Sequence, residues 1–125
     1  MVLVDTTVWI SLYRNESATL GRRLWQLAAR NEAAICGQVW VEFLGGFRNR
    51  RKRDRYTEQL AAYRWLDTPR GAFERAAEWL ARYPALGAGD TIIAATAAVN
   101  AASLLTLDRD FAMLAAEGLK VETIN

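Results

Sequence analysis

The chain has 125 residues, a formal net charge of +2 and an apolar fraction of 52% that includes five Trp. This composition is sufficient for one packed core, so we predict a single domain over residues 1–125 and exclude a disordered chain. With no histidine and one cysteine, the sequence excludes Ser-His-Asp and Cys-His catalysis, an ordinary zinc site and an intrachain disulfide.

The first half of the chain alternates short apolar runs with helical patterns. Val2-Leu3-Val4 predicts a strand that is buried on both faces. Thr6 or Thr7 is then expected to cap a short helix that runs to about residue 13. Apolar residues at helical spacing predict a second, amphipathic helix that ends near residue 31. The elements expected next are a buried strand over 33–36, a helix from 38 to about 49, and a helical continuation over 56–63.

Strands and helices continue to alternate in the second half. Residues 64–66 are a candidate strand, and Pro69 suits the first turn of a helix to about residue 83. The residues of that helix expected to face inward are Phe73, Ala76, Ala77 and Leu80. Gly87-Ala88-Gly89 is expected to break the chain before a helix that Asp90 opens and that ends near residue 101. The last expected elements are a strand over 103–106, a short helix and a strand over 120–123.

This alternation predicts the α/β class. We expect a three-layer sandwich with a central, mostly parallel sheet of four to five short strands and helices on both faces. No apolar run approaches the ~20 residues that cross a bilayer, and Met1 leads directly into a strand rather than an export signal. We therefore expect a cytoplasmic protein without a membrane partner.

Basic residues concentrate between Arg48 and Arg55, where six Lys or Arg accompany Asp54 alone. The segment has a net charge of +5, which leaves −3 for the rest of the chain. Such a cluster attracts a polyanion with salt-dependent affinity. The candidate contacts are Arg48, Arg50, Arg51 and Arg53. A solvated turn between two helices is the equally weighted alternative.

Acidic side chains are expected at the carboxyl edge of the sheet, where sheets of this kind bind their ligands. Asp5 follows the first strand and Asp108 follows the 103–106 strand. Asp90 begins the helix before that strand, and Glu42 can reach the same edge from the helix after the second strand. The residues three and four positions from Glu42 include no basic partner for its carboxylate.

Each acid also has an ordinary structural explanation. Asp90 and Asp108 can cap helices, Asp5 can belong to a turn, and Glu42 can face solvent on a helix. As a group they are harder to explain, because two carboxylates ~4 Å apart repel by about 4 kcal/mol at an effective dielectric of about 20, which exceeds the contribution of one cap. A divalent cation such as Mg²⁺, which prefers oxygen ligands, removes that repulsion.

Four segments carry a resemblance to a known family. They are residues 2–10, 41–46, 89–97 and 105–111, each of which contains one of the four acids. Because the segments occur in the family's order across nearly the whole chain, the chain resembles the PIN-domain ribonucleases. Within them it resembles the VapC-type toxins of bacterial and archaeal toxin–antitoxin pairs. The resemblance implies a PIN-like fold.

The resemblance also implies a Mg²⁺- or Mn²⁺-dependent endoribonuclease whose catalytic residues are Asp5, Glu42, Asp90 and Asp108. In that scheme Asp5, Asp90 and Asp108 hold the metal directly or through water, and Glu42 orients or deprotonates the attacking water. The implied partners are an RNA substrate, a second copy in a homodimer, and a cognate antitoxin that blocks the site. Further contacts to consider come from Thr6, Thr106 and Asp110, and Asp110 is either a cap or a spare ligand.

Three alternatives remain open at this level. The first is a catalytically silent module of the same fold that binds RNA or a protein. The second is a PIN-domain nuclease that is not a toxin. The third is another α/β phosphate enzyme. Against a haloacid-dehalogenase-like phosphatase, the sequence has no second Asp two residues after Asp5. Against a phosphate-accepting receiver domain, it has no acidic pair beside Asp5.

Overall fold

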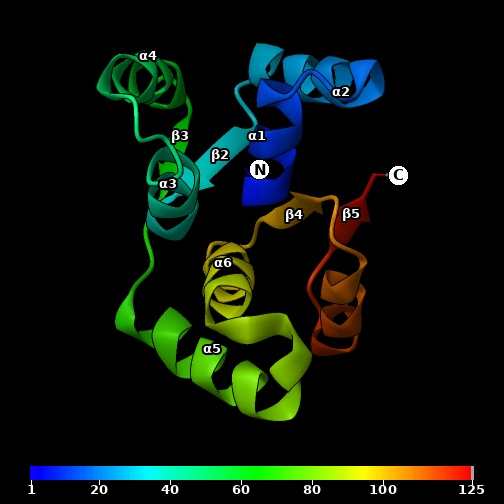
Figure 1. Cartoon of the computed structure of the whole chain (residues 1–125). Coiled ribbons are helices and arrows are strands. Elements are labelled where there is room, and N and C mark those ends of the chain that lie inside the picture. The colour runs from blue at the N-terminus through cyan, green and yellow to red at the C-terminus, as the bar shows by residue number, and fades with distance from the viewer. Residues whose placement is uncertain (125) are drawn as a thin grey trace.

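The computed structural model describes residues 1–124, which form three layers with a sheet between two groups of helices (Figure 1). The five strands are all parallel and lie in the order β3-β2-β1-β4-β5. Their bounds are β1 Val2–Val4, β2 Ala33–Cys36, β3 Arg64–Leu66, β4 Ser103–Thr106 and β5 Val121–Thr123. The predicted α/β class and its central parallel sheet are therefore confirmed.

The chain starts in the middle of the sheet and moves outward in both directions. It passes from β1 to β2 through α1 (Thr6–Tyr13) and α2 (Ala18–Ala29), and then to β3 through α3 (Gly37–Leu44) and α4 (Arg50–Leu60). It returns through α5 (Arg70–Arg82), η1 (Pro84–Leu86) and α6 (Gly87–Val99) to β4, and η2 (Arg109–Glu117) leads to β5. Figure 1 shows α2 and α4 on one side of the sheet and α5 and α6 on the other.

The reversal of direction occurs between β1 and β4, which are neighbours in the sheet. Right-handed crossovers that leave adjacent strands in opposite directions open a crevice at the carboxyl ends of those strands. The register pairs Val4 with Leu105, and the backbone N–H of Asp5 donates to the Leu105 carbonyl oxygen at 2.9 Å. The residues that follow β1 and β4 therefore meet at the switch point of the sheet.

The core is built from the strands and the inner faces of the helices. Leu3, Ile35 and Leu104 are fully buried, as expected for strands covered on both faces. On α6 the buried residues are Thr91, Ile93, Ala94, Ala95, Thr96 and Ala97, most of them small. Small side chains let α6 pack closely against its neighbours. Among the described residues, no helix has the length and hydrophobicity needed to cross a bilayer.

The helix predicted from residue 38 to about 49 ends earlier. α3 ends at Leu44, and Gly45 and Gly46 follow it. Glycine propagates a helix poorly, which explains the early end. A separate helix, α4, begins at Arg50 because the Asn49 side chain caps it by accepting from the Lys52 N–H at 3.1 Å. Most of the basic segment is therefore helical, and the alternative of a turn between two helices describes only Arg48 and Asn49.

Two predictions about helix starts were also wrong. Asp5, rather than Thr6 or Thr7, occupies the N-cap position of α1. The glycines before Asp90 do not break the chain, since α6 begins at Gly87 and includes Gly89. Gly87 has a φ of +79°, a conformation that glycine adopts without strain, so the change of direction from η1 is completed there. Asp90 is therefore inside the first turn of α6 and is not its cap.

The buried face of α5 differs from the prediction. Ala72, Ala76 and Trp79 face inward, whereas Phe73 is 49% exposed, Ala77 is exposed and Leu80 is half-buried. A shift of one residue rotates a helical face by about 100°, because a turn has 3.6 residues. Burying Trp79 removes more apolar area from water than burying Phe73, which favours the observed face.

Candidate functional site

Asp5 is the buried centre of the acidic site. Its side chain follows β1 and is 2% exposed. The hydroxyls of Thr7 and Thr106 donate to the same oxygen, Asp5 Oδ2, at 2.7 and 2.8 Å. Each hydroxyl in turn accepts a backbone N–H from the loop after β4, Leu107 to Thr7 at 3.1 Å and Asp108 to Thr106 at 3.0 Å. These bonds fix the orientation of the carboxylate and connect it to the segment that carries Asp108.

Burial raises the pKa of Asp5, while the bonds from Thr7, Thr106 and the Thr6 backbone lower it. Burial is the largest effect, so the net pKa lies above its usual value. A buried carboxylate that accepts two hydroxyl bonds is partly compensated. The charge of Asp5 therefore still acts on its surroundings in a region that water screens poorly.

Glu42 is exposed, and both of its carboxylate oxygens are held. The Thr6 hydroxyl donates to Oε1 at 2.6 Å, and the Gln38 amide donates to Oε2 at 2.9 Å. This exposure agrees with the ordinary explanation that Glu42 faces solvent on a helix, but its carboxylate is not left without partners. Gln38 lies one helical turn before Glu42 on α3, so the pair has the (i, i+4) spacing. The two donors give a solvent-accessible carboxylate a defined position.

Gly89 lets α6 approach this carboxylate. A Cβ atom at residue 89 would overlap Glu42 Oε2 and would lie 3.2 Å from Gln38 Nε2. Only a residue without a side chain leaves that space. Since Gly89 immediately precedes Asp90, the close approach brings Glu42 beside the turn that carries Asp90.

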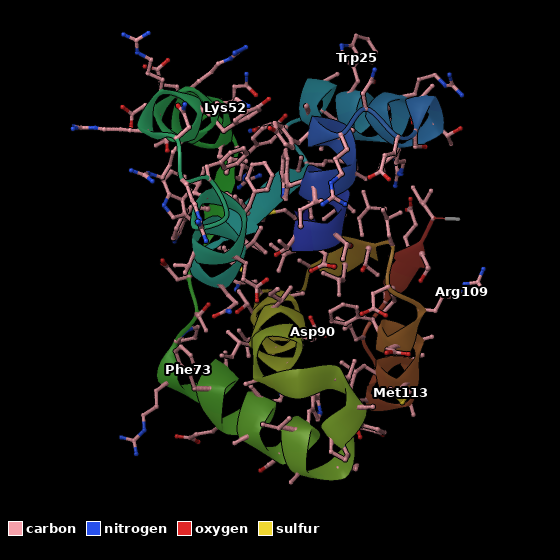
Figure 2. The ribbon with its side chains drawn as sticks, viewed as in Figure 1. Trp25, Lys52, Phe73, Asp90, Arg109 and Met113 are labelled. Atoms are coloured by element: carbon pink, nitrogen blue, oxygen red, sulfur yellow. The ribbon has the colours of Figure 1, made fainter. Side chains whose placement is uncertain are left out.

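Asp90 shows that the acids act on one another. Burial, followed by the charges of Asp5, Asp108, Glu42 and Asp110, raises the pKa of Asp90 to about 7. Figure 2 places Asp90 near the centre of the molecule, and the residue lies in the first turn of α6. The charges that raise this pKa come from three separate parts of the chain, since Asp108 and Asp110 lie in one segment. The structure thus brings the four sequence-predicted acids into one electrostatic cluster.

Asp108 has a structural task as well as a place in the cluster. It is the N-cap residue of η2, where its Oδ1 accepts the Asp110 N–H at 2.9 Å. The capping alternative for Asp108 is therefore present, and it coexists with the effect of its charge on Asp90. Asp110 is exposed and is the last of the four acids in its effect on the pKa of Asp90.

The donor set of this cluster suits a hard cation. The atoms that the acids offer as metal ligands are all carboxylate oxygens, with hydroxyl oxygens beside them. Cys36, the one cysteine, is fully buried in β2. Mutual repulsion among carboxylates is what a divalent cation relieves. Within residues 1–124, however, no three acidic or cysteine side chains form a group arranged to hold a metal ion. Mg²⁺ keeps several of its waters, so carboxylates that do not all reach the ion directly can hold it through water.

Three residues of the site were missed by sequence reasoning. Thr7, Gln38 and Gly89 each position an acid. The (i, i+4) spacing between Gln38 and Glu42 was visible in the sequence and was a usable signal. Neither the contact of Thr7 with the loop after β4 nor the clearance at Gly89 has a local signal, because each depends on elements distant in sequence.

The predicted basic contacts lie on or beside α4, and their roles differ. Arg48 and Arg51 are exposed, and Arg50 is an exposed partner of Asp54 at 3.8 Å. Arg53 is half-buried and donates to the Phe47 carbonyl oxygen at 2.9 Å. Arg53 therefore holds the segment between α3 and α4 in place, which gives it a structural role that the sequence did not indicate.

Comparison with known proteins gives a consistent result. A family model for the PIN domain matches residues 2–117. Ribonuclease VapC10 of Mycobacterium tuberculosis (strain CDC 1551 / Oshkosh) is 32% identical in an alignment of 114 residues that covers 86% of this chain and 83% of that protein. A chain of a toxin-antitoxin complex from Klebsiella pneumoniae is 25% identical with a TM-score of 0.80, over 98% of this chain and 97% of that chain. A chain of VapBC2 from Rickettsia felis, bound to promoter DNA, has a TM-score of 0.83 at 18% identity over 100% of both chains.

The raised pKa of Asp90 predicts an unusual pH dependence of stability. In metal-free protein, Asp90 loses its proton near pH 7 in the folded state but near pH ~3.9 when unfolded. Ionisation of Asp90 therefore costs stability as the pH rises between these values. We expect Asp90→Asn to be more stable than the native protein at pH 8 in EDTA, and the difference to disappear at pH 4. Urea unfolding at both pH values measures it, with Asp67→Asn, an exposed acid, as the control. Equal gains at the two pH values would contradict the prediction.

Proposed function

This chain belongs to the PIN-domain family, and we propose that it is a metal-dependent endoribonuclease that acts as the toxin of a toxin–antitoxin pair. The single observation that carries the proposal is the acidic cluster at the switch point of the sheet, in which burial, reinforced by neighbouring carboxylates, raises the pKa of Asp90 to about 7. The likeness to a ribonuclease and to a chain of a toxin-antitoxin complex supports the substrate and the biological role.

In this proposal Asp5, Asp90 and Asp108 hold Mg²⁺ or Mn²⁺, directly or through water. When bound, the ion lowers the pKa of its water and offsets charge on the scissile phosphate. The Oδ2 atom of Asp5 accepts from both Thr7 and Thr106, and these bonds fix the orientation of the carboxylate toward the ion. Asp108 uses Oδ1 to cap η2, so its other oxygen is the one available for the ion.

Glu42 is the proton acceptor of the proposed reaction. The Thr6 and Gln38 donors hold its two oxygens in a defined position beside Gly89. A carboxylate held in place next to Asp90 is arranged to receive the proton of an attacking water. The protein lacks histidine, and this arrangement requires none.

The proposed partners are RNA, a cognate antitoxin protein and a second copy of this chain. The antitoxin is proposed because the chain resembles one from a toxin-antitoxin complex at 25% identity. A polypeptide that brings a basic side chain to the acidic cluster would neutralise it without a metal and block substrate. The homodimer is an expectation from the family.

Cleavage of RNA tests the function directly. Purified protein is incubated with total RNA in the presence of Mg²⁺, in the presence of EDTA, and as Asp90→Asn. We expect fragments only from the native protein with Mg²⁺, because the other two conditions remove the ion or one of its carboxylates. Urea unfolding confirms that the variant is folded. Intact RNA in all three reactions would favour a catalytically silent module of the same fold.

The clearance at Gly89 provides a second test. Gly89→Ala places a methyl group where Glu42 Oε2 lies, and the flexible end of that side chain is displaced while the backbone keeps its place. We expect kcat to fall on the order of 100-fold with little change in stability, because small displacements of a catalytic group are costly. Gly71→Ala on α5 is the matched control, since its Cβ would have no atom within 4 Å. Full activity of Gly89→Ala would exclude the positioning of Glu42 described above.

The exposed arginines beside α4 are expected to contribute to RNA affinity through charge alone. The double variant Arg48→Gln/Arg51→Gln should lower the slope of log Kd against log salt by about 1 for a labelled single-stranded RNA, because fewer counterions are released. Arg53→Gln should instead lower the stability of the protein, because it loses the bond to Phe47. Anisotropy titrations measure the slope, with Arg22→Gln/Arg30→Gln, on α2 and at its C-cap, as the control. An unchanged slope in the α4 variant would remove this segment from the RNA-binding surface.

A further inference from the structure

A cleft of about 240 Å³ lies beside the acidic cluster, between α1 and the end of α3. Tyr13 and Arg14 form one side, and Glu42, Phe43 and Phe47 form the other. Gly46 also lines it and adds no side chain, which leaves the space open. The volume is below the roughly 300–1,000 Å³ of pockets for drug-sized ligands, so the cleft suits a single planar ring rather than a larger molecule.

The walls of this cleft are aromatic and held in place by their neighbours. The Tyr13 and Phe47 rings meet edge to face with centroids 5.0 Å apart, and Phe43 contacts Phe47 in the same way at 5.2 Å. Behind them, Tyr56 stacks on Phe47 at 5.1 Å. The Tyr13 side chain is nevertheless 40% exposed, so part of its ring surface is open to solvent. The cleft therefore presents a rigid aromatic surface that requires no rearrangement to receive a ring.

The cleft and the acidic cluster share Glu42. Its carboxylate accepts from Thr6 and Gln38 on the side of the cluster, and the residue also lines the cleft. A ligand in the cleft consequently lies next to the proposed proton acceptor. For a nucleic-acid chain cut at the cluster, the cleft therefore adjoins the path of the chain on the side of Glu42.

Positive charge borders the aromatic surface. Arg14 is exposed and lines the cleft, and the Lys52 ammonium donates to the Tyr13 hydroxyl at 3.4 Å. Figure 2 shows Lys52 on α4, the helix that carries most of the basic segment. Aromatic rings bordered by Arg and Lys are the combination that binds single-stranded nucleic acid, with bases on the rings and phosphates on the cations. A purely apolar partner would gain nothing from these two cations.

We propose that this cleft is a nucleobase subsite, in which the base next to the scissile phosphate stacks on Tyr13 while Arg14 contacts the adjoining phosphate. The inference rests on the proposed ribonuclease function and adds a residue that determines how substrate is held. Tyr13 binds substrate and takes no part in proton transfer. Removing its ring is therefore expected to raise KM rather than to lower kcat.

The test compares intact and base-free RNA. The cleavage site of the native protein is first mapped in a mixed-sequence RNA, and an eight-nucleotide RNA around it is made with and without the base flanking the scissile phosphate. We expect Tyr13→Leu to raise KM by roughly tenfold on the intact octamer, within the range that stacking on one aromatic ring contributes. Tyr13→Phe, which keeps the ring, should recover most of that loss. On the base-free octamer, native protein and Tyr13→Leu should have equal KM.

Trp25→Leu is the matched control, because Trp25 is 72% exposed on α2 (Figure 2) and does not line the cleft. An equal effect of Tyr13→Leu on both octamers, or no effect on either, would overturn the subsite. The subsite would also be overturned if Tyr13→Leu kept the native KM and lost only the binding of a partner protein. If native protein cuts no RNA at all, the proposed function itself fails, which is a different result.

A second measurement does not depend on the folding of a variant at Tyr13. An octamer with 4-thiouridine at the flanking position is irradiated in complex with Asp90→Asn, and the crosslinked peptide is identified by mass spectrometry. Crosslinks to Tyr13 or Phe47 support the subsite. Crosslinks confined to other elements exclude it.

Discussion

Repulsion among carboxylates at one edge of the sheet is the interaction on which the rest of this structure depends. It appears in Asp90, whose pKa rises to about 7 because burial is reinforced by the charges of Asp5, Asp108, Glu42 and Asp110. The surrounding residues offset part of the cost with hydrogen bonds. Thr7 and Thr106 serve Asp5, and Thr6 and Gln38 serve Glu42, but none of them bears a charge. The remaining repulsion is the source of affinity for a cation.

The topology of the sheet brings these charges together. Because the chain leaves β1 and β4 in opposite directions, the residues after these neighbouring strands face one crevice. The glycine at 89 and the small residues of α6 allow that helix to come close to α3 and the sheet. Stability and function are thus separated along β1: its apolar residues form the core, and the next residue, Asp5, belongs to the acidic cluster. An aromatic cleft continues the same edge on the far side of Glu42.

The sequence predicted the layers of the fold well because both-face burial produces short, uniformly apolar strands such as Val2-Leu3-Val4. It predicted the ends of helices less well. Where a cap or glycine decides between two helices, as at Gly45 and Asn49, hydrophobic spacing continues across the break. It also misplaced the buried face of α5, because Phe73 and Trp79 are both aromatic and only packing against α6 selects between them.

For the candidate site, the sequence alone determined the chemistry available. The absence of histidine, a single cysteine and four separated acids leave oxygen ligands and a hard cation, whatever the fold. Only the tertiary structure decided how those acids are held. Thr106 reaches Asp5 across 101 residues of chain, Thr6 reaches Glu42 across 36, and the space at Gly89 exists only when α3 and α6 are packed together. Such contacts are properties of distances between elements, and a linear pattern of residues does not contain those distances.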